Sequence, residues 1–173
     1  MERETDGPRP GGPAAFGKAV ELRLLSRLLE EGFEVYVPLV DEGVDAVVRW
    51  GDGAFLPLQI KATSRRARPE DAGLFAAIRF RAGCWYLLYA EALDTLWLLS
   101  AEELEALASR SRRGRGAGQR HVQLAGYRRD AEGRPRLLER GRAYVAHDLS
   151  RLREASAGAW GHGRRCHGKE VRP

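Results

Sequence analysis

Two apolar segments joined by Gly51-Asp52-Gly53 constrain the fold of this chain more than any other feature of its sequence. Residues 44–50 are β-branched and mostly apolar, and residues 54–63 form a similar run after the glycines. Such a pattern is typical of a β-hairpin. A three-residue loop pairs position 50 with position 54, and this pairing decides which side chains share a face. Because Pro57 lacks an N–H, we expect it at a bulge or on a sheet edge.

Three polar residues fall on one face of this hairpin. With a three-residue loop, Asp45 lies directly opposite Gln59, and Lys61 shares their face because it follows Gln59 by two positions. A carboxylate, an amide oxygen and an ammonium group then meet on one patch of sheet, which is costly to bury without a partner. A two-residue loop, or a bulge at Pro57, would send Gln59 to the other face.

A divalent cation is the partner that suits this group. Mg²⁺ prefers oxygen ligands, which the Asp45 carboxylate and the Gln59 amide provide together with waters and substrate phosphate oxygens. Lys61 is suited to orient or deprotonate an attacking water, or to neutralise charge on a phosphorane. The group therefore predicts metal-assisted phosphoryl chemistry. The alternative without catalysis is that the Lys61 side chain only extends from the strand to bring its ammonium group into solvent.

The remaining sequence predicts helices around further strands. Apolar residues three and four apart predict a helix over residues 14–31, which Gly32 ends. Ser100 and Glu103 form a capping box that begins a second helix. Further strands are expected at 34–39, 84–90, 95–99, 121–126 and 144–146 and a short helix at 149–155, whereas 74–81 fits strand or helix equally. This order indicates an α/β fold, with a mixed central β-sheet flanked by helices.

Length and composition limit the class of protein. A chain of 173 residues is the size of one domain. A formal net charge of +5 favours a polyanionic partner, although it also serves solubility alone. The two cysteines make no disulfide framework, the N-terminus lacks an apolar signal segment, and no apolar run approaches the ~20 residues of a membrane span. These features predict a cytoplasmic protein without a membrane partner.

Three short blocks resemble the PD-(D/E)xK nuclease superfamily, namely GKAVE at 17–21, GVDAVV at 43–48 and LQIKA at 58–62. The chain is similar to its QxK variant and to small homing-endonuclease-like and restriction-endonuclease-like members. The resemblance implies a restriction-endonuclease-like core. The resemblance covers the nuclease core at 14–108. Composition predicts a disordered leader at 1–13, an Arg-rich loop with the C-terminal part of the same domain at 109–157, and a flexible tail at 158–173.

The resemblance also implies an activity and a set of site residues. The catalytic set is Glu21, Asp45, Gln59 and Lys61, in a Mg²⁺-dependent endonuclease that hydrolyses phosphodiester bonds in DNA, with Mn²⁺ as a possible substitute. The expected metal ligands are Asp45, Gln59, the Ile60 carbonyl and Glu21. Gln59 departs from the usual Glu or Asp, and a neutral amide binds magnesium more weakly. Cutting both strands implies a homodimer or a higher homo-oligomer.

Basic residues outside this set are candidates for phosphate contacts. They are Lys18, the three arginines that follow the catalytic strand (Arg65, Arg66 and Arg68), and Arg112, Arg113 and Arg115 in the Arg/Gly loop. For the last three, an exposed loop without such a role is an equal interpretation.

Aromatic and sulfur-bearing residues are assigned to structure instead. Trp85, Tyr86, Tyr89, Trp97 and Cys84 lie in apolar strand-like runs, so we expect them in the core. His162, Cys166 and His167 lack a nearby fourth ligand, which argues against a zinc site.

Two alternative functions remain open. A catalytically inactive nucleic-acid-binding module with the same fold would bind DNA without magnesium and cut nothing. An interaction subunit of a larger assembly would bind DNA weakly and hold a stable protein partner.

Overall fold

The computed structural model describes residues 12–40, 42–110 and 119–158, without the side chains of residues 127 and 128. The predicted leader at 1–13 and tail at 158–173 fall almost entirely outside these ranges, although the first helix already begins at Pro13. The candidate phosphate contacts Arg112, Arg113 and Arg115, and the residues His162, Cys166 and His167, also lie outside the described residues.

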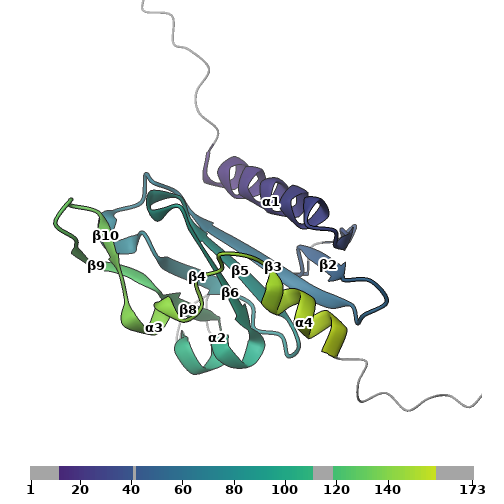
Figure 1. The fold of residues 1–173 in the computed structure, drawn as a ribbon. Helices are drawn as coiled ribbons and strands as arrows, with labels where there is room; N and C mark the ends of the chain where they lie inside the picture. Colours follow the sequence, from purple (N-terminus) through teal and green to yellow (C-terminus); the bar gives the residue numbers. More distant parts are fainter. Residues whose placement is uncertain (1–11, 41, 111–118, 159–173) are drawn as a thin grey trace, which may run out of the picture.

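A mixed five-stranded sheet forms the centre of the fold (Figure 1). Its strands are β1 (Glu34–Tyr36), β2 (Ala46–Arg49), β3 (Leu56–Thr63), β5 (Trp85–Ala90) and β6 (Thr95–Ser100), in the order β1-β2-β3-β5-β6. β3 runs parallel to β5, and the other neighbours are antiparallel. The predicted α/β class with a mixed central sheet is therefore confirmed. The strands predicted at 34–39, 84–90 and 95–99 are present, the first of them shorter than expected.

The two faces of this sheet are covered by different elements. Helix α1 (Pro13–Glu30) packs on one face, where Val20 and Leu24 meet the even-numbered side chains of β3 such as Leu58. Helix α2 (Ala101–Leu107) lies on the opposite side (Figure 1). Its predicted capping box is present, because the Ser100 hydroxyl accepts the Glu103 N–H and the Glu103 carboxylate accepts the Ser100 N–H.

A second, smaller sheet covers the face that carries Gln59 and Lys61. Its strands are β4 (Leu74–Ile78), β8 (Arg120–Gln123) and β7 (Ser109–Arg110), in the order β4-β8-β7. The undecided segment 74–81 is thus a strand over its first part. The predicted strand 121–126 is instead divided at Leu124 between β8 and β9 (Ala125–Arg129), and β9 pairs with β10 (Pro135–Leu137). The core between the two sheets includes Phe75, Tyr86 and Trp97.

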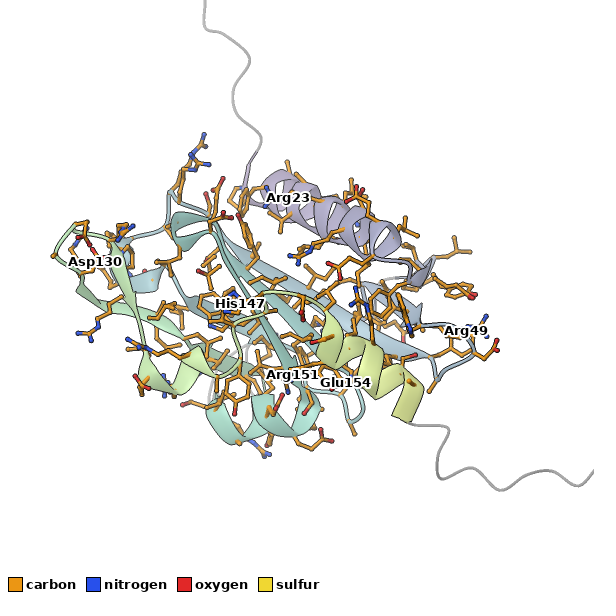
Figure 2. The ribbon with its side chains drawn as sticks, in the orientation of Figure 1. Arg23, Arg49, Asp130, His147, Arg151 and Glu154 are labelled. Atoms are coloured by element: carbon orange, nitrogen blue, oxygen red, sulfur yellow. The ribbon has the colours of Figure 1, made fainter. Side chains whose placement is uncertain are left out.

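The C-terminal segment closes the fold over the central sheet. The predicted strand at 144–146 is wrong, because only an isolated bridge joins Val145 to Trp97 after the short helix α3 (Glu139–Arg142). The expected last helix is α4 (Ser150–Gly158). Arg151 from α4 donates to the Leu98 carbonyl at 2.9 Å and to the Glu103 carboxylate, which holds α4 near the sheet (Figure 2).

The hairpin register predicted from loop length is confirmed for three successive pairs, Ala46 with Leu58, Val47 with Pro57 and Val48 with Leu56. Pro57 causes no register shift in this ladder. Pairing between β3 and β5 starts only at Leu58, so Pro57 faces no β5 partner and its missing N–H removes no bond on that side. Of the two predicted positions for Pro57, the bulge is therefore wrong, whereas the side of β3 toward β5 is locally an open edge at this residue.

Ser156 of α4 clamps the two ends of the hairpin loop. Its buried hydroxyl accepts the Trp50 N–H at 3.0 Å and donates to the Ala54 carbonyl at 2.8 Å. Its own carbonyl accepts the Ala54 N–H at 2.8 Å. A Cβ on Gly53 would lie 2.5 Å from that carbonyl oxygen, so only glycine allows this approach. The long-range clamp thus reinforces the register that the loop sets locally.

Replacing Ser156 with alanine is expected to lower the free energy of unfolding by about 1–3 kcal/mol, because two partly buried backbone groups lose their partner. Urea denaturation followed by circular dichroism measures the change. Ser26→Ala is the matched control, since the Ser26 hydroxyl is exposed and donates to Glu30 at 3.3 Å. The control should stay within about 0.5 kcal/mol of the unaltered protein. An equally small loss for Ser156→Ala would show that the hairpin is stable without the clamp.

Candidate active site

Asp45 lies immediately before β2, where the regular ladder with β3 ends. Its N–H donates to the Leu58 carbonyl at 2.8 Å, although Leu58 already pairs with Ala46 in the ladder. The pairing therefore shifts by one at Asp45, and the predicted direct opposition to Gln59 does not extend to this residue. The Asp45 carboxylate instead accepts the Ile60 N–H at 2.6 Å. Asp45 is thereby fixed beside the strand that carries Gln59 and Lys61.

Gln59 places an amide oxygen without a partner in the interior of the protein. The side chain is 2% exposed, and its Nε2 donates to the Gly43 carbonyl at 3.0 Å. A carbonyl oxygen only accepts hydrogen bonds, so this contact fixes the orientation of the amide. Gln59 Oε1 is then left buried without a hydrogen-bond partner among the described residues. Such an atom is destabilising unless a ligand satisfies it, so the donor set fits a cation.

Lys61 shares the face of Gln59. In the parallel ladder Gln59 is next to Tyr86 and Lys61 is next to Leu88, and both neighbours belong to the core between the two sheets. Lys61 is half-buried, and its side chain makes no ion pair or hydrogen bond within the described ranges. It is therefore an ammonium group held on a central strand, two positions from the unpartnered amide oxygen.

Glu21 comes from the other side of the sheet. It is on α1, and its carboxylate pairs with the Lys18 ammonium at 2.6 Å. The Glu21 side chain is only 14% exposed, which is unusual for a glutamate on an amphipathic helix. The structure thus brings Asp45, Gln59 and Ile60 together. The carboxylate of Glu21 instead forms an ion pair with Lys18.

Two other titratable groups near the site stay protonated at neutral pH. Burial raises the pKa of the Cys84 thiol to about 11 and that of the Tyr86 hydroxyl to about 12. Cys84 is buried, as predicted from the sequence. Neither group therefore supplies a thiolate or a phenolate at neutral pH.

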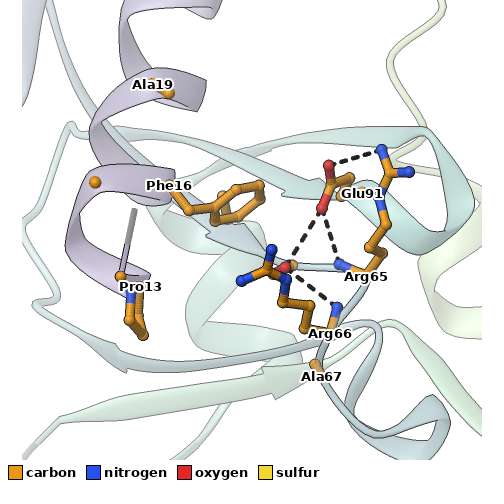
Figure 3. Close-up of a pocket in the computed structure, with 11 residues that line it drawn as sticks. Pro13, Phe16, Ala19, Arg65, Arg66, Ala67 and Glu91 are labelled. Atoms are coloured by element: carbon orange, nitrogen blue, oxygen red, sulfur yellow. Dashed lines mark hydrogen bonds and ion pairs between the residues drawn. The ribbon is translucent and has the colours of Figure 1, made fainter. Parts of the chain in front are cut away.

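Two of the arginines that follow β3, Arg65 and Arg66, line a groove of about 870 Å³ between the start of α1 and the end of β3 (Figure 3). Arg65 donates to Glu91 through its guanidinium at 2.9 Å and its N–H at 3.0 Å, and these hydrogen bonds lower the pKa of Glu91. Arg66 lines the same groove, beside Phe16. Asp45, Gln59 and Lys61 are not among its lining residues, so it adjoins the candidate site without containing it.

The other predicted phosphate contacts are exposed and paired. Arg68 is bound to Asp71 at 2.9 Å, and the Lys18 ammonium, 62% exposed, is bound to Glu21. An anionic ligand at either position would compete with the carboxylate already bound there. Among the described candidates, Arg66 is the one for which no ion pair with a carboxylate is found.

Sequence reasoning missed the segment that follows β4. Arg79 and Arg81 lie next to Gly43 and Glu42, on the side of the sheet that carries Gln59. The only local signal is the basic and aromatic run Arg79-Phe80-Arg81. Its place in space depends on β4, whose secondary structure was undecided from the sequence.

The described residues contain neither a cluster of typical metal-binding side chains nor a membrane-spanning helix. Within 12–40, 42–110 and 119–158, no group of three or more His, Cys, Asp and Glu side chains is arranged to hold a metal ion. A metal at Asp45 would therefore depend on amide, carbonyl, water or substrate oxygens as further ligands. No described helix has both the length and the apolarity needed to cross a membrane.

Comparison with known proteins supports the fold. No protein-family model matches the sequence, and no curated protein matches it. Among solved structures, the chain is similar to that of a bacterial homing endonuclease, I-Ssp6803I, with a TM-score of 0.62 and 16% sequence identity. The alignment covers 89% of this chain and 100% of the other. It therefore extends beyond residues 14–108, the range of the motif blocks, and at this identity it shows a common fold.

Proposed function

We propose that this protein is a metal-dependent endonuclease that hydrolyses phosphodiester bonds in DNA, as a QxK variant of the PD-(D/E)xK superfamily. The buried Gln59 Oε1 without a partner, beside the Asp45 carboxylate, carries the proposal. Supporting it are the basic net charge of +5 and the fold shared with a bacterial homing endonuclease.

In the proposed site, Asp45, Gln59 and the Ile60 carbonyl would hold Mg²⁺ or Mn²⁺. Glu21, which lies on α1 and is paired with Lys18, would bind the metal or its water only by leaving that ion pair. The bound ion would polarise the scissile phosphate and lower the pKa of a coordinated water. Lys61 donates to the attacking water or to a non-bridging phosphate oxygen, and so stabilises the charge that develops in the transition state. Asp45 keeps this geometry because the Ile60 N–H anchors its carboxylate.

Cleavage of both DNA strands requires two such sites, so we propose a homodimer or a higher homo-oligomer as the active form. A specific observation favours a second function. Gln59 brings no negative charge, so metal affinity is lower than with a carboxylate, and loss of that affinity would leave a nucleic-acid-binding module of the same fold.

Incubation with supercoiled plasmid and linear DNA tests the proposal. We expect nicked and linear products with Mg²⁺ or Mn²⁺, none with EDTA, and only background cleavage by Asp45→Asn. This substitution keeps the size of the side chain but removes its charge. Asp52→Asn is the matched control, because Asp52 is exposed in the hairpin loop. DNA that is retarded on a gel but stays intact with every metal would replace this proposal with the binding module.

A further inference from the structure

Residues 79–81 are brought to the candidate site by an irregularity in β4. The pairing of β4 with β8 shifts between Phe75 and Ile78, and Ala77 has a φ of +55°, a left-handed conformation that is rare for alanine. Bulges of this kind redirect the side chains that follow them and are common next to active sites. Here the chain beyond Ile78 turns toward Gly43 and Gln59.

The Arg79 side chain packs directly against the backbone of Gly43. A Cβ built on Gly43 would lie 2.9 Å from Cδ of Arg79 and 3.4 Å from Nε2 of Gln59. Gly43 also has a φ of +89°. The absence of a side chain at this position therefore allows the aliphatic part of Arg79 to lie beside the amide of Gln59.

Two side chains hold the backbone of this segment. The Tyr86 hydroxyl accepts the Arg81 N–H at 2.9 Å and donates to the Arg79 carbonyl at 3.2 Å. The Arg81 guanidinium donates to the Glu42 carbonyl at 2.5 Å. Because Tyr86 is the register partner of Gln59, the segment is held by the same part of the sheet that forms the site.

Arg79 and Arg81 differ in what their guanidinium groups do. Arg81 is occupied by the residue before Gly43, whereas Arg79 is exposed and its side chain has no hydrogen bond or ion pair in the described part of the chain. An arginine whose backbone is held in place and whose guanidinium group is unpaired is preorganised to bind an anion. Guanidinium groups bind phosphate oxygens with two parallel N–H bonds.

We propose that Arg79 binds a backbone phosphate of the DNA substrate next to the bond that is cut, and that Tyr86 and Arg81 are positioning residues that hold Arg79 there. The inference rests on the proposed function, because it assigns a substrate contact to that same site. It names a contact that the resemblance of the three sequence blocks does not include.

Salt-dependent binding tests the contact without catalysis. Affinity for a short labelled duplex is measured in EDTA by fluorescence anisotropy, between about 50 and 200 mM salt. Arg79→Ala is expected to reduce the slope of log K against log salt concentration by about 0.9, the value for one lost phosphate contact, and to weaken binding equally for unrelated sequences. Arg23→Ala is the matched control, since Arg23 lies on α1 over Tyr89, on the opposite face of the sheet (Figure 2).

A double-mutant cycle tests the positioning role. Tyr86→Phe removes the hydroxyl that holds residues 79–81, and it should weaken binding in the unaltered protein but not in the Arg79→Ala background. A purely structural role for Tyr86 predicts equal losses in both backgrounds. Tyr89→Phe is the matched control, because that hydroxyl donates to Asp94 from the opposite face of the sheet and should change neither affinity nor slope.

The outcomes separate this proposal from the nuclease proposal. An unchanged salt slope in Arg79→Ala, with metal-dependent cleavage intact in the unaltered protein, overturns the Arg79 contact alone. A reduced slope in a protein that cuts nothing supports the contact and overturns the hydrolytic activity. Absence of any DNA binding by the unaltered protein overturns both.

Discussion

Replacing Lys61 with methionine is expected to slow DNA cleavage by about 10²–10⁴-fold, the usual contribution of a positioned proton donor or acceptor. Methionine is similar in length and apolar, so the half-buried position next to Leu88 remains filled and the free energy of unfolding should change little. Single-turnover cleavage rates at saturating protein isolate the chemical step from DNA binding.

Two further variants make this result specific to Lys61. Lys61→Arg keeps the charge but loses the compact, deprotonatable ammonium, so we expect slow cleavage here too. Arg23→Met is the matched control, because Arg23 lies on α1 over Tyr89, on the opposite face of the sheet from Lys61. Its cleavage rate should therefore fall by less than about tenfold. Full activity of Lys61→Met would remove Lys61 from the proposed mechanism.

Replacing Trp97 with alanine is expected to lower the free energy of unfolding by about 3–5 kcal/mol. Trp97 is fully buried and packs edge-to-face on Phe75 of the small sheet at 5.8 Å, in a core cluster against which Val145 also packs. It therefore connects the central sheet to the small sheet and to the C-terminal segment. Urea denaturation followed by circular dichroism measures the loss.

Leu39→Ala is the control for this prediction, because Leu39 is fully exposed and should change stability by no more than about 0.5 kcal/mol. Since residues 79–81 directly follow β4, we also expect Trp97→Ala to weaken DNA binding at temperatures where the rest of the fold persists. A stability loss below about 1 kcal/mol would mean that the two sheets do not share a cooperative core.

Features that depend on neighbouring residues were predictable. The three-residue loop Gly51-Asp52-Gly53 predicted the hairpin register, and the pairs Ala46–Leu58 and Val48–Leu56 confirm it. Ser100 and Glu103 predicted the start of α2. Gly32, which has a φ of +88°, predicted the end of α1. In each case the hydrogen bonds lie within a few residues, so local sequence was sufficient.

The candidate site was predictable only in part. The common face of Gln59 and Lys61 follows from strand periodicity. The contact of Asp45 with the Ile60 N–H does not, because it depends on where the ladder between β2 and β3 ends. The roles of these residues came from the resemblance of short motifs and stay predictions until cleavage is measured.

Only the tertiary structure decided which distant segments meet. Nothing in the local sequence pairs β3 with β5 in parallel, or places Ser156 across the hairpin loop, because their partners are far away in the chain. The position of Arg79 beside Gln59 depends on a strand that periodicity did not resolve and on the left-handed Ala77 within it. The hairpin and its polar face are determined by residues that are close together in the sequence. The surroundings of that face are determined by the packing of the two sheets around Tyr86 and Trp97.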